Sequence, residues 1–187
     1  MMDRRAFLTG CAATFAGSMA ARAETGLSRM TAYRFSFAAL SGDDIRLSSY
    51  AGRPLLIVNT ASQCGYTPQY AGLQQLWGEF HERGLMIIGV PSNDFNQEPG
   101  GVSAIAETAQ HQYGVSFPLT AKAVVTGPTA HPFYRWAAEA RPKDVPRWNF
   151  HKYLIGRDGS VADVFASAVE PADTRIKTAV ARALADS

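Results

Sequence analysis

Cys64 is the residue in this 187-residue chain with the clearest capacity for chemistry. The chain holds two cysteines, and the other, Cys11, lies in an N-terminal segment with the features of a removable leader. A lone thiol can act as a nucleophile, because its deprotonated form is reactive. It can equally be an inert core residue, since free cysteines are often buried. Taken alone, the residue type leaves both interpretations open.

The predicted elements place Cys64 between a strand and a helix. Residues 55–58 form a continuous apolar run, which predicts a strand buried on both faces. After the cysteine, Thr67 is predicted to cap a helix and Pro68 suits its first position. Apolar residues then recur at helical spacing up to an expected end near Gly84. Reacting groups gather at the carboxyl ends of strands in open α/β sheets, so the location favours a chemical role.

The remaining pattern predicts an α/β domain with a thioredoxin-like fold. A second buried strand at 85–90 completes a strand–helix–strand unit with parallel strands. We expect a central mixed sheet flanked by helices, with an N-terminal β-hairpin. Further elements are expected as follows: the N-terminal hairpin over 33–47, helices at 103–112 (capped by Ser103), 132–140 and 173–185, and a hairpin joining 153–155 to 161–165.

Thr67 narrows the chemistry that Cys64 can perform. In thioredoxins the corresponding positions carry the two cysteines of a C-x-x-C motif, and here the second is threonine. Dithiol exchange within the motif is therefore excluded, whereas chemistry on one thiol is not. Two rival functions remain at this point, a thioredoxin-like thiol-disulfide oxidoreductase and a thiol-carrying binding module.

Three segments together resemble the glutathione peroxidase family. They are 52–67 (GRPLLIVNTASQCGYT), 96–100 (NQEPG) and 147–150 (RWNF), in the order that the family shows. The resemblance extends over roughly 33–184. It implies a peroxidase of the oxidative stress response that reduces hydrogen peroxide and organic hydroperoxides and needs no metal or organic cofactor.

The resemblance also assigns roles to four residues. It implies that Cys64 is the peroxidatic residue, which passes through a sulfenic acid, and that Gln97, Trp148 and Asn149 assist it. The physical chemistry of the side chains agrees with these roles. Amide and indole N–H groups are neutral donors, and donors that converge on one sulfur atom would favour the thiolate and orient a peroxide.

The chain departs from the family in ways that bear on its partners. Residues 107–113, where many non-animal members carry a resolving cysteine, contain none. We therefore expect an external thiol reductant, glutathione or a thioredoxin-like protein, and Arg147 is a candidate to bind a glutathione carboxylate. Asp94 deviates from a second family signature, and we expect it to be a turn residue facing solvent. Residues 137–147 are too brief to hold the interface loop of tetrameric members, which predicts a monomer.

Residues 1–23 are predicted to be a cleavable, twin-arginine-like signal peptide, and 24–187 the mature domain. Arg4 and Arg5 precede a modest apolar run, and Ala21 and Ala23 suit a signal peptidase. The leader carries the whole formal net charge of +2, so nothing in the mature chain indicates nucleic acid or stable membrane insertion. We expect a periplasmic protein. The alternative is a lipoprotein anchored at Cys11, which is disfavoured because its apolar stretch would be very short.

Overall fold

The computed structural model describes residues 30–186. The chain divides into two compact units, of which the second spans Thr31–Ser187. The leader predicted at 1–23, including Cys11, lies outside the described residues. All that follows concerns the second unit.

A four-stranded mixed sheet forms the centre of this unit in the described residues. Its strands are β3 (Leu55–Thr60), β4 (Met86–Pro91), β5 (Lys152–Ile155) and β6 (Val161–Phe165), in the spatial order β4-β3-β5-β6. β3 and β4 are parallel, whereas β5 is antiparallel to both β3 and β6. The N-terminal hairpin, β1 (Ser36–Ala38) and β2 (Asp44–Arg46), is a separate antiparallel pair. The predicted mixed sheet and hairpin are confirmed.

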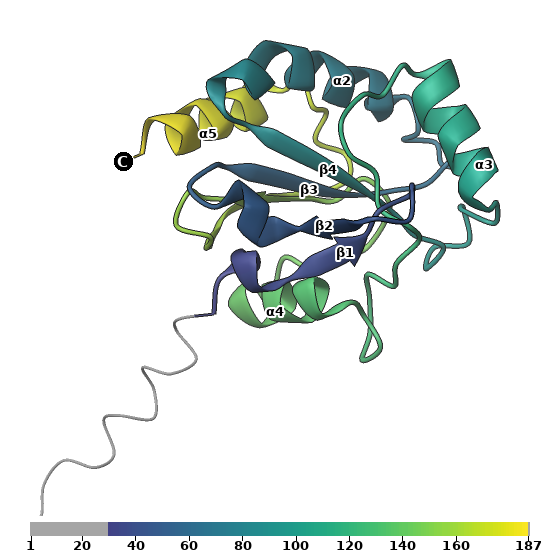
Figure 1. Ribbon diagram of the computed structural model, residues 1–187, viewed down its shortest axis with the longest axis horizontal. Helices are drawn as coiled ribbons and strands as arrows, with labels where there is room; N and C mark the ends of the chain where they lie inside the picture. The colour runs from purple at the N-terminus through teal and green to yellow at the C-terminus, as the bar shows by residue number, and fades with distance from the viewer. Residues whose placement is uncertain (1–29, 187) are drawn as a thin grey trace, which may run out of the picture. The chain divides into compact units, whose positions relative to one another are not determined.

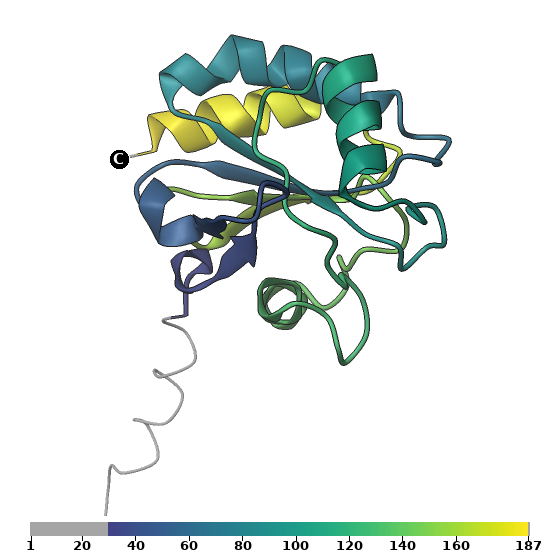
Figure 2. The same cartoon turned by 45° about the vertical axis from the view of Figure 1, so that its right-hand side comes forward.

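Helices cover both faces of the sheet. α2 (Gln69–Phe80) and α5 (Thr174–Ala185) lie side by side on one face, and α4 (Pro132–Ala140) lies on the other (Figures 1 and 2). α3 (Val102–Ala106) continues as a π-helix over Glu107–Gln112. Short 3-10 helices occupy Ala32–Arg34, Leu47–Tyr50 and His81–Arg83. This arrangement leaves the carboxyl ends of β3 and β4 free to carry loops.

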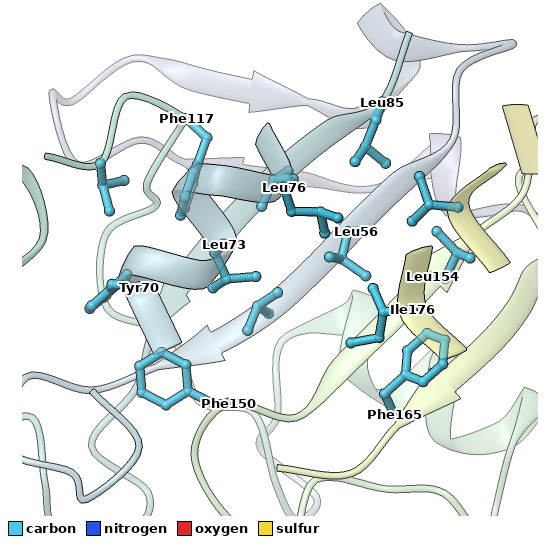
Figure 3. Packing of buried hydrophobic residues seen from close by; sticks show 14 of the residues in the cluster. Leu56, Tyr70, Leu73, Leu76, Leu85, Phe117, Phe150, Leu154, Phe165 and Ile176 are labelled. Carbon is cyan, nitrogen blue, oxygen red and sulfur yellow. The ribbon is translucent and has the colours of Figure 1, made fainter. Parts of the chain in front are cut away.

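The main core lies between β3 and the α2–α5 layer. Every residue of β3 is buried, as a strand covered on both faces requires. Leu73 and Leu76 of α2 point toward Leu56 of this strand, and Ile176 of α5 completes the contact (Figure 3). Cys64 belongs to the same buried cluster. The loop that carries the thiol is therefore anchored in the core at both ends.

The prediction that Ser103 caps a helix is wrong. The helix begins at Val102, and Gly101 is its N-cap, without a side-chain hydrogen bond. Gly100, the residue before this N-cap, packs against the first turn of the helix: a Cβ at Gly100 would lie 2.5 Å from the Cβ of Ala104. Only a residue without a side chain allows this close approach. The helix also does not continue as a regular α-helix, since it widens to a π-helix after Ala106.

Candidate active site

Cys64 lies in a tight loop that Thr67 closes with its side chain. The Cys64 N–H donates to Thr67 Oγ1 at 3.0 Å, and that hydroxyl donates to the Ala61 carbonyl oxygen at 2.9 Å. Thr67 was predicted to cap the helix, but α2 begins at Gln69 and has no side-chain cap. The threonine hydroxyl is already engaged by the loop, so it cannot serve the helix. The residue at the second C-x-x-C position thus shapes the cysteine loop.

The sulfur atom is held close to the surface without being widely exposed. Cys64 has a fractional exposure of 7%, and its Sγ accepts a hydrogen bond from the Tyr66 N–H at 3.3 Å. A donor aimed at sulfur stabilises the thiolate relative to the thiol. The location between β3 and α2 matches the predicted one.

The loop carrying Gln97 is attached directly to the cysteine loop. The Gln63 N–H donates to the Gln97 carbonyl oxygen at 3.0 Å. The N–H and hydroxyl of Ser62 donate to Glu98 Oε2 at 2.8 and 2.9 Å. Three hydrogen bonds therefore tie residues 62–63 to residues 97–98, and they fix the Gln97 backbone beside the Cys64 loop.

Glu98 is a fully buried carboxyl group. Burial raises its pKa, while its bonds to Ser62 and the nearby Lys122 ammonium act in the opposite direction. Its second oxygen, Oε1, is buried and has no hydrogen-bond partner among residues 30–186. The Glu98 carboxylate also raises the pKa of the buried Tyr70 hydroxyl, which burial raises most. Buried polar atoms of this kind usually find a partner, so Glu98 is held in an energetically costly place to support the cysteine loop.

The third predicted segment, 148–150, is held against the end of β3 by Asn59. The Asn59 Nδ2 donates to the Trp148 carbonyl oxygen at 3.1 Å, and its Oδ1 accepts from the His151 N–H at 3.1 Å. The Phe150 N–H donates to the Asn59 carbonyl oxygen at 2.6 Å. Phe150 has a φ of 63°, which is uncommon for a residue with a side chain. Asn59 thus fixes a tight turn that presents Asn149.

Asn149 and Gln97 meet through their side chains. Asn149 is fully buried, and its Nδ2 donates to Gln97 Oε1 at 2.8 Å. Because an amide oxygen and nitrogen diverge, this bond turns the Gln97 NH₂ group to the other side, where it can donate. Asn149 Oδ1 is buried and finds no hydrogen-bond partner in the part of the chain that the structure describes. The predicted amide pair is therefore assembled by the fold.

Trp148 lies at the surface of the site. It is 41% exposed, and its ring packs against Phe95, with the centroids 5.4 Å apart. Within residues 30–186, the Cys64 sulfur atom receives no hydrogen bond from Gln97, Trp148 or Asn149. The hydrogen bonds that link the Cys64 loop to Gln97 run instead through the loop backbones, from the Gln63 N–H to the Gln97 carbonyl oxygen.

Asp94 does not face solvent as predicted. Its Oδ2 accepts bonds from the N–H groups of Val125 and Thr126, at 2.7 and 2.8 Å, and from the Thr126 hydroxyl at 3.0 Å. An ionised carboxylate that accepts several donors is a strong loop anchor. Asp94 therefore organises the segment beside Phe95, and its charge is directed at these donors.

Sequence analysis missed three residues that build the site. Glu98 stands in the recognised NQEPG segment, yet its anchoring of Ser62 was not foreseen. Asn59 stands in the recognised segment 52–67, yet its hydrogen bonds to the 148–151 turn were not foreseen. Lys152 is fully buried in the sheet. The sequence signal for it is a lysine that directly precedes the apolar residues 153–155 of a predicted strand.

The described residues contain no group of three or more His, Cys, Asp or Glu side chains placed to hold a metal ion. None of their helices is both long enough and apolar enough to cross a membrane.

Comparison with solved structures defines the class of fold. The apo crystal structure of Trgpx matches with a TM-score of 0.69 at 31% identity, over 84% of this chain and 97% of that one. A thiol:disulfide interchange protein of the thioredoxin family from Chlorobium tepidum matches with a TM-score of 0.61 at 17% identity, over 80% and 92% of the two chains. The domain has the predicted thioredoxin-like fold, with one thiol at the end of β3.

The chain belongs to the glutathione peroxidase family. The family profile, described as glutathione peroxidase, matches residues 32–138. The hydroperoxy fatty acid reductase of Synechocystis sp. is 43% identical over 158 residues, which are 79% of this chain and 93% of that protein. A glutathione peroxidase of Lactococcus lactis is 41% identical over 146 residues, 76% and 93% of the two chains. The protein is thus a thiol-dependent peroxidase, as the motifs predicted.

Proposed function

We propose that Cys64 is the peroxidatic nucleophile and that Gln97, Trp148 and Asn149 are neutral groups that assist it. The observation that carries the proposal is the linkage of three segments: the Cys64 loop is bonded to the Gln97 loop, and Gln97 is bonded to Asn149. Neutral donors suit this role, because they stabilise negative charge on sulfur and on the departing oxygen without titrating themselves.

The proposed catalytic cycle reduces one peroxide at the expense of two external thiols, and it needs no other reactant than protons. The Cys64 thiolate attacks one peroxide oxygen, the S–O bond forms, and the O–O bond breaks. The departing alkoxide or hydroxide takes up a proton to give an alcohol or water, and Cys64 is left as sulfenic acid. One external thiol then forms a mixed disulfide and releases water. A second thiol attacks that disulfide and returns the Cys64 thiol, so two thiols are oxidised for each peroxide reduced.

Single-turnover oxidation of the mature protein tests this function. We expect rapid, stoichiometric labelling of Cys64 by a sulfenic-acid probe after addition of a hydroperoxide, and no labelling of Cys64→Ser. Wild-type peroxide reduction by Cys64→Ser would refute the mechanism. A Cys64 that reacts no faster than a free thiol would instead favour a thiol-carrying binding module.

We infer that organic hydroperoxides, including those of fatty acids, are substrates together with hydrogen peroxide. The Synechocystis relatives are named hydroperoxy fatty acid reductases, and Trp148 is substantially exposed, which suits an accessible site. The second-order rate constants of Cys64 oxidation by hydrogen peroxide and by a C18 fatty acid hydroperoxide measure this preference. A fatty acid hydroperoxide that oxidises Cys64 far more slowly than hydrogen peroxide would remove it as a substrate.

We infer that the reductant is an external small thiol, with glutathione as the first candidate. Arg147, next to Trp148, lines a cavity of about 140 Å³ together with Lys143 and the nearly buried His151. Two exposed cations at one cavity suit the carboxylates of glutathione. Arg147→Ala should slow reduction of oxidised Cys64 by glutathione while leaving oxidation by peroxide unchanged. If Arg147→Ala slowed the oxidation and the reduction of Cys64 equally, Arg147 would not be part of a reductant site. If a thioredoxin reduced oxidised Cys64 faster than glutathione does, a thioredoxin-like protein would be the reductant instead.

We propose that the protein is exported to the periplasm after cleavage behind Ala23 and acts there as a monomer. The paired Arg4 and Arg5 and the small residues at Ala21 and Ala23 support cleavage, and the family match begins only at residue 32. Mass spectrometry of the mature N-terminus decides the processing: a diacylglyceryl Cys11 would show a lipoprotein. Cell fractionation then checks the compartment. Light scattering after size-exclusion chromatography measures the oligomeric state.

A further inference from the structure

Lys152 is a fully buried lysine whose ammonium group joins three segments of the chain. The residue has 0% exposure and lies in β5, opposite Val58 of β3. Its Nζ donates to Gln69 Oε1, the Phe150 carbonyl oxygen and the Val169 carbonyl oxygen, each at 2.7 Å. All three donors of the ammonium are therefore used. The acceptors lie at the start of α2, in the turn before β5 and in the loop between β6 and α5.

Two of these acceptors belong to segments that carry proposed site residues. Phe150 follows Asn149, and its φ of 63° is held by the hydrogen bonds of its own backbone. Gln69 is the first residue of α2, which begins directly after the Cys64 loop. Gln69 is itself fixed, because its Nε2 donates to the Ser167 carbonyl oxygen at 2.8 Å and to Glu170 Oε1 at 3.2 Å.

The position is costly for a charged group. Burial lowers the pKa of Lys152 to about 7, and Glu170 counteracts this in part. Taking an ammonium out of water carries a penalty that only good hydrogen-bond geometry offsets. An apolar residue would fill the space without this penalty, but it would provide no donor for the Phe150 carbonyl. The geometry therefore points to a specific task for the ammonium.

We propose that Lys152 is a positioning residue for the peroxidase reaction, which holds the Asn149–Phe150 turn in a fixed relation to the start of α2 and the Cys64 loop. The inference rests on the proposed roles of Cys64 and Asn149. Lys152 acts through its hydrogen bonds to these neighbouring segments and does not contact the substrate. With its proton, Nζ serves all three acceptors; as a neutral amine it has two N–H groups, so one of the three bonds is lost.

The experiment compares Lys152→Met with the surface variant Lys177→Met, in the mature protein. Lys177 pairs with Glu79 at 2.6 Å on the exposed side of α5, and such pairs contribute little. We expect Lys152→Met to lower the rate constant of Cys64 oxidation by about tenfold or more at pH 6, since small misplacements of assisting groups have effects of this size. Lys177→Met should match the wild type.

The pH dependence separates positioning from a purely structural role. The groups that face Nζ are Gln69 from α2, Glu170 before α5 and the neighbouring His151, whose pKa of about 4 keeps it neutral from pH 6 to 9. We expect the ratio of the wild-type to the Lys152→Met oxidation rate to fall as the pH rises through about 7.

A second variant covers the case in which Lys152→Met fails to fold. Gln69→Glu keeps an acceptor for the ammonium but loses the Nε2 donors to Ser167 and Glu170, whereas Gln69→Met loses both the acceptor and these donors. We expect Gln69→Met to be oxidised several-fold more slowly than Gln69→Glu, with an unchanged circular dichroism spectrum. Wild-type oxidation rates in folded Lys152→Met, or in Gln69→Met where the first variant does not fold, would overturn the proposal. The peroxidase assignment would survive that result, because it depends on the loss of sulfenic acid in Cys64→Ser.

Discussion

Asn149 Nδ2 donates a hydrogen bond to Gln97 Oε1 across 2.8 Å, although the two residues are 52 positions apart in the chain. The bond determines which end of the Gln97 amide is free to donate. It joins the 96–98 loop to the 148–150 turn, and the bond from Gln63 to the Gln97 backbone joins both to the Cys64 loop. The side chain of Asn149 is therefore the element on which the orientation of Gln97 depends.

Asn149→Ala should slow the oxidation of Cys64 by about 10²-fold, because the loss of one fixed donor at a developing charge typically has this effect. Without Asn149 Nδ2, the Gln97 amide can rotate and present either end. Stopped-flow measurement of sulfenic acid formation checks the prediction. Gln112→Ala, an exposed glutamine at the end of the π-helix, is the control and should react as the wild type does. A loss below threefold in Asn149→Ala would mean that Gln97 is oriented by other contacts.

Thr67→Val should destabilise the protein by about 1–3 kcal/mol, since it leaves the buried Cys64 N–H without its acceptor. Valine preserves the volume and removes the hydroxyl. Thr67→Ser keeps the hydroxyl and should retain most of the stability. Urea unfolding of both variants measures the difference in the free energy of unfolding. If Thr67→Val lost less stability than Thr67→Ser, the methyl group and not the hydroxyl would be what matters at this position.

The stability contributed at Glu98 should depend on pH in a predictable direction. Its pKa in the folded state is raised above the ordinary value of 4.5, so the folded protein binds the proton more tightly than the unfolded chain does. The corresponding stability is present below pH 4.5 and is lost as the pH rises through the folded-state pKa.

Glu98→Gln should remove this dependence, because an amide does not titrate. We expect the free energy of unfolding of the wild type to fall relative to that of Glu98→Gln as the pH rises above 4.5. Urea unfolding at a series of pH values between 4 and 7 gives the difference between the two proteins. A difference that stays constant across the series would show that Glu98 titrates normally.

Lys152 should give the opposite trend at higher pH. Its folded-state pKa of about 7 lies below the ordinary value of 10.5, so the unfolded chain binds more protons between these values. Stability should therefore rise with pH across this window, by about 1.4 kcal/mol for each pH unit. The difference in unfolding free energy between the wild type and Lys152→Met measures it, with Lys177→Met as the reference. If the difference in unfolding free energy between the two proteins did not change between pH 7 and 10, the pKa of Lys152 would not be lowered by burial.

Local patterns in the sequence were sufficient for most of the helices and strands and for the position of Cys64 between a strand and a helix. The apolar run of 55–58 gave a strand buried on both faces, and the spacing of Tyr70, Leu73 and Leu76 gave the helix that covers it. These predictions succeed because burial and helical periodicity are properties of neighbouring residues. The three motifs placed the chain in its family for a related reason, since each is a continuous segment.

Hydrogen bonds between distant segments were decided only by the tertiary structure. Thr67 was expected to cap a helix and Asp94 to face solvent, yet both side chains bind backbone N–H groups of loops. Which of its possible partners a polar side chain meets depends on how strands and loops pack, and a spacing pattern carries no such information. The same holds for Glu98 beneath Ser62 and for Lys152 below the Asn149 turn. The sequence alone determined the kind of fold and where in it Cys64 lies, because both depend on local patterns, while the packing decided which buried polar groups hold the cysteine loop in place.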